Sequence, residues 1–266
     1  MAIKSDFEKI QNLYGIIKHT IAVMSGKGGV GKSSIAALLA AALNRKGFTV
    51  GILDADITGP SIPKVFGIKG SAEVIDNIIL PRESGKGVKL ISINLLLEKE
   101  EQPVIWRGPL IAGTVKQFYE QVDWGDLDFL VVDLPPGTGD VPLTVMQSIP
   151  LDGIIVVSSP QELVALIVKK AIHMAEEMNI PILGLIENMS YFECPECSSR
   201  TEIFGKSQAR DVSQDTGIPL LGRLPILPKI AQFSDEGKIE AIDSAYPGVF
   251  EEVVNNLIQN KNLSIS

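Results

Sequence analysis

The segment Gly26–Ser33 combines four glycines, two lysines and a serine in the pattern G-x-x-x-x-G-K-[ST]. It follows a short apolar run and precedes a helical pattern, which is the setting that this phosphate-binding motif requires. Glycines let successive backbone N–H groups face one anion, and the following helix adds a partial positive charge at its N-terminus. Lys32 can then reach the β- and γ-phosphates, and Ser33 can bind Mg²⁺. The residues expected to contact a nucleotide are Gly26, Lys27, Gly28, Gly29, Val30, Gly31, Lys32, Ser33 and Ser34.

Three aspartates follow apolar runs that are typical of strands. Asp54 and Asp56 come after Thr49–Leu53, and Asp133 closes Phe129–Val132. Parallel strands of an α/β sheet bind ligands beyond their carboxyl ends, so these carboxylates are expected at one crevice. An apolar strand that ends in Asp is the Walker B pattern, and this Asp can hold Mg²⁺ directly or through water. The sequence alone does not divide the work between Asp54 and Asp56.

Cys194 and Cys197 are the two cysteines of the chain, and they form a C-x-x-C in a long connection at about residues 187–204. A zinc or iron–sulfur site normally needs four ligands. Two copies related by a two-fold axis would bring two pairs together and supply four thiolates. Thiols without a role are the alternative. A thioredoxin-like dithiol is disfavoured, because its C-x-x-C would be expected in a βαβ setting.

Short apolar runs alternate with helical patterns along the chain, which indicates βαβ units. We therefore predict an α/β fold with a doubly wound, mainly parallel sheet and helices on both faces, as in P-loop NTPases. The sequence shows no repeat or linker, so residues 1–266 are expected to form a single domain. The predicted helices cover about residues 6–18, 33–46 and 161–178, and the predicted strands cover 20–24, 49–53, 129–132, 153–157 and 182–186, with a pair of short strands within 72–94.

The composition excludes several classes of protein. The 32 acidic residues outnumber the 24 basic ones, giving a net charge of −8 that disfavours nucleic-acid binding. No apolar run reaches the roughly 18–20 residues of a spanning helix. The N-terminus is charged and lacks the apolar region of a secretory signal. We expect a cytoplasmic protein that binds neither nucleic acid nor membranes.

Lys27 directly follows the first glycine of the loop and completes the pattern K-G-G-x-G-K-[ST]. This deviant Walker A motif resembles that of the ATPases that include the MinD, ParA and nitrogenase iron-protein groups. The resemblance implies that Lys27 reaches a partner's nucleotide across a dimer interface, as an arginine finger does; a solvated loop lysine is the alternative. It also implies that Asp56 orients the attacking water, that Asp54 assists near Mg²⁺, and that Asn188 reads the adenine edge with Pro225 beside the base. A turn-forming role for Asn188 stays open.

Further motifs resemble those of the Mrp/ApbC-type iron–sulfur cluster carriers, over about residues 18–250. They are Ile57–Pro63, Trp106–Pro109, Asp133–Asp140 and Asn188–Ser190 leading to the C-P-x-C of Cys194 and Cys197. The resemblance implies a slow ATPase that uses ATP and Mg²⁺. It also implies a homodimer, formed through the nucleotide face and the C-x-x-C loop, that bridges a [4Fe-4S] cluster and passes it to apo iron–sulfur proteins.

Three alternatives stay open beside this interpretation. Thiolate quartets accept zinc as well as iron–sulfur clusters, and the partner subunit can be a different chain. A MinD- or ParA-like positioning ATPase is the alternative function. Membrane-binding members of that kind need a basic amphipathic tail, whereas Phe250–Ile258 carries no positive charge.

Overall fold

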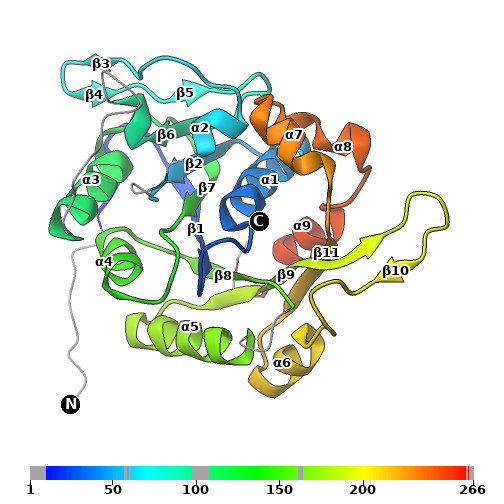
Figure 1. Cartoon of the computed structure of the whole chain (residues 1–266). Helices are drawn as coiled ribbons and strands as arrows, with labels where there is room; N and C mark the ends of the chain where they lie inside the picture. The colour runs from blue at the N-terminus through cyan, green and yellow to red at the C-terminus, as the bar shows by residue number, and fades with distance from the viewer. Residues whose placement is uncertain are drawn as a thin grey trace.

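The computed structural model describes residues 10–56, 59, 61–96, 108–160, 164–261 and 263. Within them the main sheet has the strand order β10-β9-β8-β1-β7-β2-β6-β5, with β11 beside β9 (Figure 1). Its central strands pair in parallel, and only β5 and β10 are antiparallel to their neighbours. The strands are β1 (Ile17–Ser25), β2 (Val50–Asp54), β5 (Arg82–Glu83), β6 (Lys89–Ser92), β7 (Leu127–Asp133), β8 (Gly153–Ser158), β9 (Ile182–Glu193), β10 (Arg200–Thr201) and β11 (Leu220–Pro225).

Helices cover both faces of this sheet. In Figure 1, α3, α4 and α5 lie on one side, and α1 and α9 lie on the other. The α-helices are α1 (Lys32–Arg45), α2 (Ile62–Val65), α3 (Gly108–Gln121), α4 (Asp140–Ser148), α5 (Val164–Met178), α6 (Ala209–Thr216), α7 (Lys229–Asp235), α8 (Ile242–Ala245) and α9 (Glu251–Ile258), with 3-10 turns at Ile93–Leu95 and Ile239–Ala241. No helix in the described part of the chain is long and apolar enough to cross a membrane.

The sequence explains why the sheet lies between two layers of helices. All residues of β2 and β8 are buried, as expected for strands that are covered on both faces. In α1, Ile35, Leu39 and Leu43 repeat every four residues and are buried against the sheet. The helix ends before Gly47, which has a φ of +95°. The predicted α/β fold with a mainly parallel sheet is confirmed.

The prediction of an N-terminal helix at about residues 6–18 is wrong for residues 10–18, the part that the structure describes. Residues 13–15 form a bend, no residue from 10 to 16 is helical, and β1 begins at Ile17. The side chain of Asn12 donates hydrogen bonds to backbone carbonyls at and just beyond the C-terminal end of α3. Gly15 lies so close to Gly125 that a Cβ at residue 15 would be 1.9 Å from its carbonyl oxygen. These contacts with a distant part of the chain hold the segment in a bent, non-helical path.

Residues 72–94 form more strands than predicted. The expected pair exists as the antiparallel strands β5 and β6, and β6 also joins the main sheet in parallel beside β2. A second hairpin, β3 (Val74–Ile75) and β4 (Ile78–Ile79), forms a separate two-stranded sheet. Its turn residues Asp76 and Asn77 have φ values of +50° and +66°, in the region that Asn and Asp tolerate best.

The connection predicted at residues 187–204 is largely a hairpin, which we call the C-x-x-C hairpin (residues 187–202). β9 continues to Glu193 and pairs with β10, so the two cysteines lie at the turn. The turn is closed by a hydrogen bond from Cys194 N to Ser199 O of 3.0 Å and one from Ser198 N to Cys194 O of 2.9 Å. Figure 1 shows this hairpin projecting from the body of the molecule.

Candidate functional site

The parallel register brings the predicted acidic residues to the phosphate loop. Asp133, the last residue of β7, is in register with Asp54 on β2 and with Val23 on β1. Two residues beyond Val23, β1 ends and the phosphate loop (residues 26–33) begins. The loop after β7 is tied to the same point, because Gly137 N donates to Ser25 O at 2.9 Å. Both carboxylates therefore lie at the carboxyl edge beside the loop, as predicted.

The phosphate loop adopts a conformation that needs its glycines. Gly29 and Gly31 have φ values of +83° and +81°, which L-residues rarely adopt. The side chain of Asn188 donates from Nδ2 to Val30 O at 2.9 Å and is buried there. A Cβ on Gly31 would be 2.4 Å from that nitrogen. Gly31 is thus required both by its backbone angle and by Asn188, and α1 begins at the next residue.

Lys32 and Asp133 form a buried ion pair at the start of α1. Lys32 Nζ lies 2.6 Å from Asp133 Oδ1, and both side chains are almost fully buried. Burial raises the pKa of Asp133, while Lys32 and a hydrogen bond from Ser33 oppose the rise. Asp133 Oδ2 receives no hydrogen bond from the described residues. A buried carboxylate oxygen next to a serine hydroxyl is the kind of donor set that suits Mg²⁺.

Asp54 is buried next to Asp133 and has a strongly altered pKa. Desolvation, followed by the charge of Asp133, raises the pKa of Asp54 to about 8. Its carboxylate accepts weak hydrogen bonds from the backbone N–H groups of Asp56, at 3.2 Å, and of Ile62, at 3.3 Å. Asp56 is itself buried at the same edge. Two adjacent acidic groups of this kind repel each other unless a cation or a proton lies between them.

Replacing Asp54 with asparagine is expected to stabilise the nucleotide-free protein more at pH 8 than at pH 5. The pKa of Asp54 is about 8 in the folded chain, whereas an unfolded aspartate has a pKa of about 3.9. Between these values the folded chain keeps a proton that the unfolded chain has lost, so wild-type stability falls as pH rises. Asparagine lacks this slope, and we expect a gain of about 1–3 kcal/mol at pH 8. Urea unfolding at both pH values measures it, and equal pH slopes would contradict it.

The carboxyl edge of the sheet also holds buried polar atoms without hydrogen bonds among the described residues, and sequence reasoning missed all of the residues that carry them except Asp133. Four buried side-chain atoms receive or make no hydrogen bond within the described part of the chain: Ser92 Oγ, Asp133 Oδ2, Ser158 Oγ and Glu187 Oε1. Ser92, Asp133 and Ser158 are the last residues of β6, β7 and β8. Glu187 is the last residue of β9 that pairs with β8. A serine that ends an apolar run was the available sequence signal.

The two cysteines are accessible at the turn of the C-x-x-C hairpin. Cys194 is half-buried and Cys197 is exposed, and neither is in a disulfide. Cys197 Sγ lies 3.1 Å from Ser199 Oγ, and this contact, with the Ser199 backbone, lowers the pKa of the Cys197 thiol. Among the described residues no three His, Cys, Asp or Glu side chains gather to form a metal site. Within the described chain Cys194 and Cys197 therefore stand as a pair of thiols without a third ligand of these kinds beside them.

Three other predicted residues lie on three different parts of the fold: β9, β11 and the phosphate loop. Asn188 contacts the loop directly, through its bond to Val30 O. Pro225 is at the end of β11, in register with Tyr191 of β9, on the side of the C-x-x-C hairpin. Lys27 is partly exposed in the loop itself. The adenine contacts of Asn188 and Pro225 and the trans role of Lys27 stay predictions.

A glycine-rich loop between a parallel strand and a helix, with a buried Asp at the end of the neighbouring strand, defines a P-loop NTPase. Comparison with known families agrees: the ParA-type family described as NUBPL iron-transfer P-loop NTPase matches residues 16–259. The chain belongs to this family.

Individual proteins show the same likeness. An iron–sulfur cluster carrier protein of Clostridium perfringens is 44% identical over 254 residues, covering 91% of this chain and 89% of its own. A nucleotide-binding protein of Archaeoglobus fulgidus, solved in complex with ADP, is 47% identical with a TM-score of 0.78, covering 85% of this chain and 89% of its own. MinD in the MinC:MinD complex of Aquifex aeolicus shares the fold, with a TM-score of 0.64 at 19% identity, covering 93% of this chain and 97% of its own.

Proposed function

We propose that this chain is an ATP-binding and ATP-hydrolysing iron–sulfur cluster carrier. The observation that carries the proposal is the pair of accessible thiols at the end of a projecting hairpin, on the strand that also contacts the phosphate loop. The family match and the name of the Clostridium perfringens relative support it. The cluster is cargo in this proposal, so that the hairpin must be able to receive it and release it.

The nucleotide half of the proposal uses the carboxyl edge. The phosphate loop, with Lys32 at the start of α1, would hold the phosphates of ATP. Ser33, Asp133 and Asp54 would hold Mg²⁺, which bridges phosphate oxygens and neutralises their charge. Asp56 would orient the attacking water. Lys27 of one subunit would reach the nucleotide of the other, which links hydrolysis to dimer formation.

The thiol half of the proposal needs two copies of the chain. Cys194 and Cys197 supply two ligands, and a [4Fe-4S] cluster takes four. A homodimer that meets through its nucleotide faces and its C-x-x-C hairpins would complete the set with a partner's pair. Apo iron–sulfur proteins in the cytoplasm would then receive the cluster. Zinc is the other metal that four thiolates fit.

Anaerobic reconstitution with iron and sulfide tests this function. We expect about four iron atoms per two chains, with a dimer mass in solution, because each chain supplies two of the four ligands. Iron and sulfide analysis, visible absorbance and native mass measure the outcome. Four iron atoms on a monomer would contradict bridging. Failure to bind iron, with about one zinc per two chains in the purified protein, would indicate the zinc-bridged alternative.

A further inference from the structure

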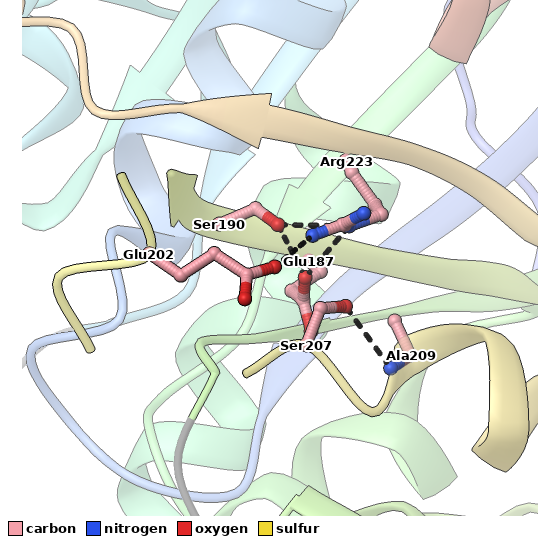
Figure 2. Close-up of polar contacts among 6 residues, drawn as sticks. All are labelled: Glu187, Ser190, Glu202, Ser207, Ala209 and Arg223. Atoms are coloured by element: carbon pink, nitrogen blue, oxygen red, sulfur yellow. Dashed lines mark hydrogen bonds and ion pairs between the residues drawn. The ribbon is translucent and has the colours of Figure 1, made fainter. Parts of the chain in front are cut away.

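A charged cluster lies at the base of the C-x-x-C hairpin and joins its two limbs (Figure 2). Arg223 of β11 lies between three residues: its Nε contacts Glu187 Oε2 at 3.1 Å and Ser190 Oγ at 2.9 Å, and its Nη2 contacts Glu202 Oε1 at 3.3 Å. Ser190 also donates to Glu187 Oε2. Glu187 and Ser190 are on β9, and Glu202 follows β10. One guanidinium therefore connects the outgoing limb, the returning limb and the neighbouring strand.

The same stretch of β9 contacts the phosphate loop through a bulge. Arg223 is in register with Glu187, and Pro225 is in register with Tyr191. Between these pairs β9 has three residues, 188–190, where β11 has one, so β9 bulges. Met189, in the middle of the bulge, has a φ of +56°. On one side of it Asn188 binds Val30 O of the phosphate loop, and on the other Ser190 binds Arg223.

This arrangement fixes Arg223 to β9 more firmly than to the returning limb. The Glu187 side chain is fully buried, and the ion pair with Arg223 joins it to β11 away from solvent. The contact with Glu202 is at the surface, with side chains 26% and 41% exposed, and such pairs add little to stability. One oxygen of Glu187, Oε1, receives no hydrogen bond from the described residues, so the cluster is not fully satisfied. A small shift of the bulge can therefore alter the Glu202 contact without unfolding the strand.

We propose that Arg223 is a positioning residue that couples the phosphate loop to the C-x-x-C hairpin through the bulge at residues 188–190. A nucleotide bound at the phosphate loop displaces or fixes Val30. Through the hydrogen bond between Val30 and Asn188, it thereby changes the preferred position of Asn188 and the conformation of the bulge. Arg223 then passes this bias to Glu202 and sets the direction of the hairpin turn. The inference rests on the proposed function for its purpose, since the hairpin is where the cargo would be held.

Thiol labelling of the cluster-free, reduced protein tests the coupling. The labelling rate of Cys194 and Cys197 with a maleimide is measured with and without saturating Mg·ADP and Mg·ATP. We expect nucleotide to change the rate in the wild type by about fivefold or more, at the lower end of typical couplings between sites. For each protein the readout is the labelling rate with nucleotide divided by the labelling rate without it, which we call the nucleotide ratio. Any change in the intrinsic reactivity of the thiols between variants affects both rates and cancels in this ratio.

Two variants should lose this ratio while they still bind nucleotide. Glu202→Gln removes the negative charge from the surface contact and leaves the buried pair intact. Arg223→Lys keeps a cation beside Glu187 but loses the guanidinium fork. For both, the ratio should fall to about one, with ADP affinity unchanged within about twofold. Glu193→Gln is the matched control, because it removes the same charge from the Arg200–Glu193 pair of the same hairpin, and the Glu193 side chain is 42% exposed. It should keep the wild-type ratio.

The outcomes separate this inference from the proposed function. The coupling would be overturned if nucleotide did not change the labelling rate of the wild type. It would also be overturned if Glu202→Gln showed the same ratio of labelling rates, with and without nucleotide, as the wild type. Loss of the ratio in Glu193→Gln would also overturn it, since any ion pair of the hairpin would then suffice. None of these measurements involves a cluster. If the protein binds iron but nucleotide does not change thiol labelling, the coupling fails and the proposed function stands. If nucleotide changes thiol labelling but the protein binds no iron, the proposed function fails and the coupling stands.

Discussion

Replacing Gly31 with alanine is expected to weaken ADP and ATP binding about 100-fold, which corresponds to a loss of about 2.8 kcal/mol. The new Cβ would lie 2.4 Å from Asn188 Nδ2, and the residue would keep a φ of +81° only under strain. Either the Asn188 amide must give up its place beside Val30 or the backbone of the loop must move, and the strained φ at residue 31 adds to this disturbance of the loop. We therefore expect the N–H groups of the loop to converge less well on the phosphates. Isothermal titration with each nucleotide measures the change.

Two other glycines of the loop separate strain from steric overlap. Gly29 has a similar φ, +83°, with nothing within 4 Å of its Cβ position, whereas Gly28 has neither a positive φ nor a close neighbour. For the nucleotide-free protein we expect no loss of stability in Gly28→Ala and a loss of about 1–2 kcal/mol in Gly29→Ala. Gly31→Ala should lose about 2–4 kcal/mol, since overlap adds to strain. Equal losses for residues 29 and 31 would mean that Asn188 imposes no constraint.

Replacing either Cys194 or Cys197 with alanine is expected to reduce iron loading from about two atoms per chain to nearly none. Each substitution removes two of four thiolates from the symmetric site that we propose, and a two-thiolate remainder is too few for a four-iron cluster. Iron and sulfide content after anaerobic reconstitution, with visible absorbance, is the measurement. Loading that persists in both variants would exclude these residues as the ligands.

Nucleotide binding by the same cysteine variants shows that they are folded. The thiols lie at the hairpin turn, away from the contact between Asn188 and Val30, so ADP affinity should stay within about twofold of the wild type. Glu196→Gln is the matched control for the turn, because Glu196 is exposed between the two cysteines and the substitution leaves both thiols in place. It should load iron as the wild type does.

Much of the fold and of the nucleotide site could be predicted because the signals are local. The phosphate loop is a contiguous motif, and Asp133 follows directly on a run of apolar residues that is buried throughout. Continuous apolar runs also gave the parallel strands β2, β7 and β8 nearly to their ends. In these segments the local pattern and the tertiary environment favour the same structure.

The predictions from sequence are wrong where contacts with residues far away in the sequence determine the local structure. Residues 10–16 have helical periodicity, but Asn12 bonds to the end of α3 and Gly15 packs on Gly125, more than a hundred residues away. The extension of β9 beyond Ile186 was missed because polar residues follow, although pairing with β10 and β11 continues the strand. The contact between Glu187 and Arg223, 36 residues apart, depends entirely on that register.

Within the part of the chain that the structure describes, four buried side-chain atoms along the carboxyl edge of the sheet have no hydrogen-bond partner, so the nucleotide-free fold is frustrated along this edge. They lie where β6, β7 and β8 end and where β9 ends its pairing with β8. Burying polar atoms without hydrogen bonds costs free energy, and a ligand that supplies a cation or hydrogen bonds at this edge would remove part of that cost. Because the ligand binds the folded state, its binding would increase the free energy of unfolding. Substitutions that stabilise the empty protein most should therefore cluster at this edge, and they should be the ones that activity tolerates least.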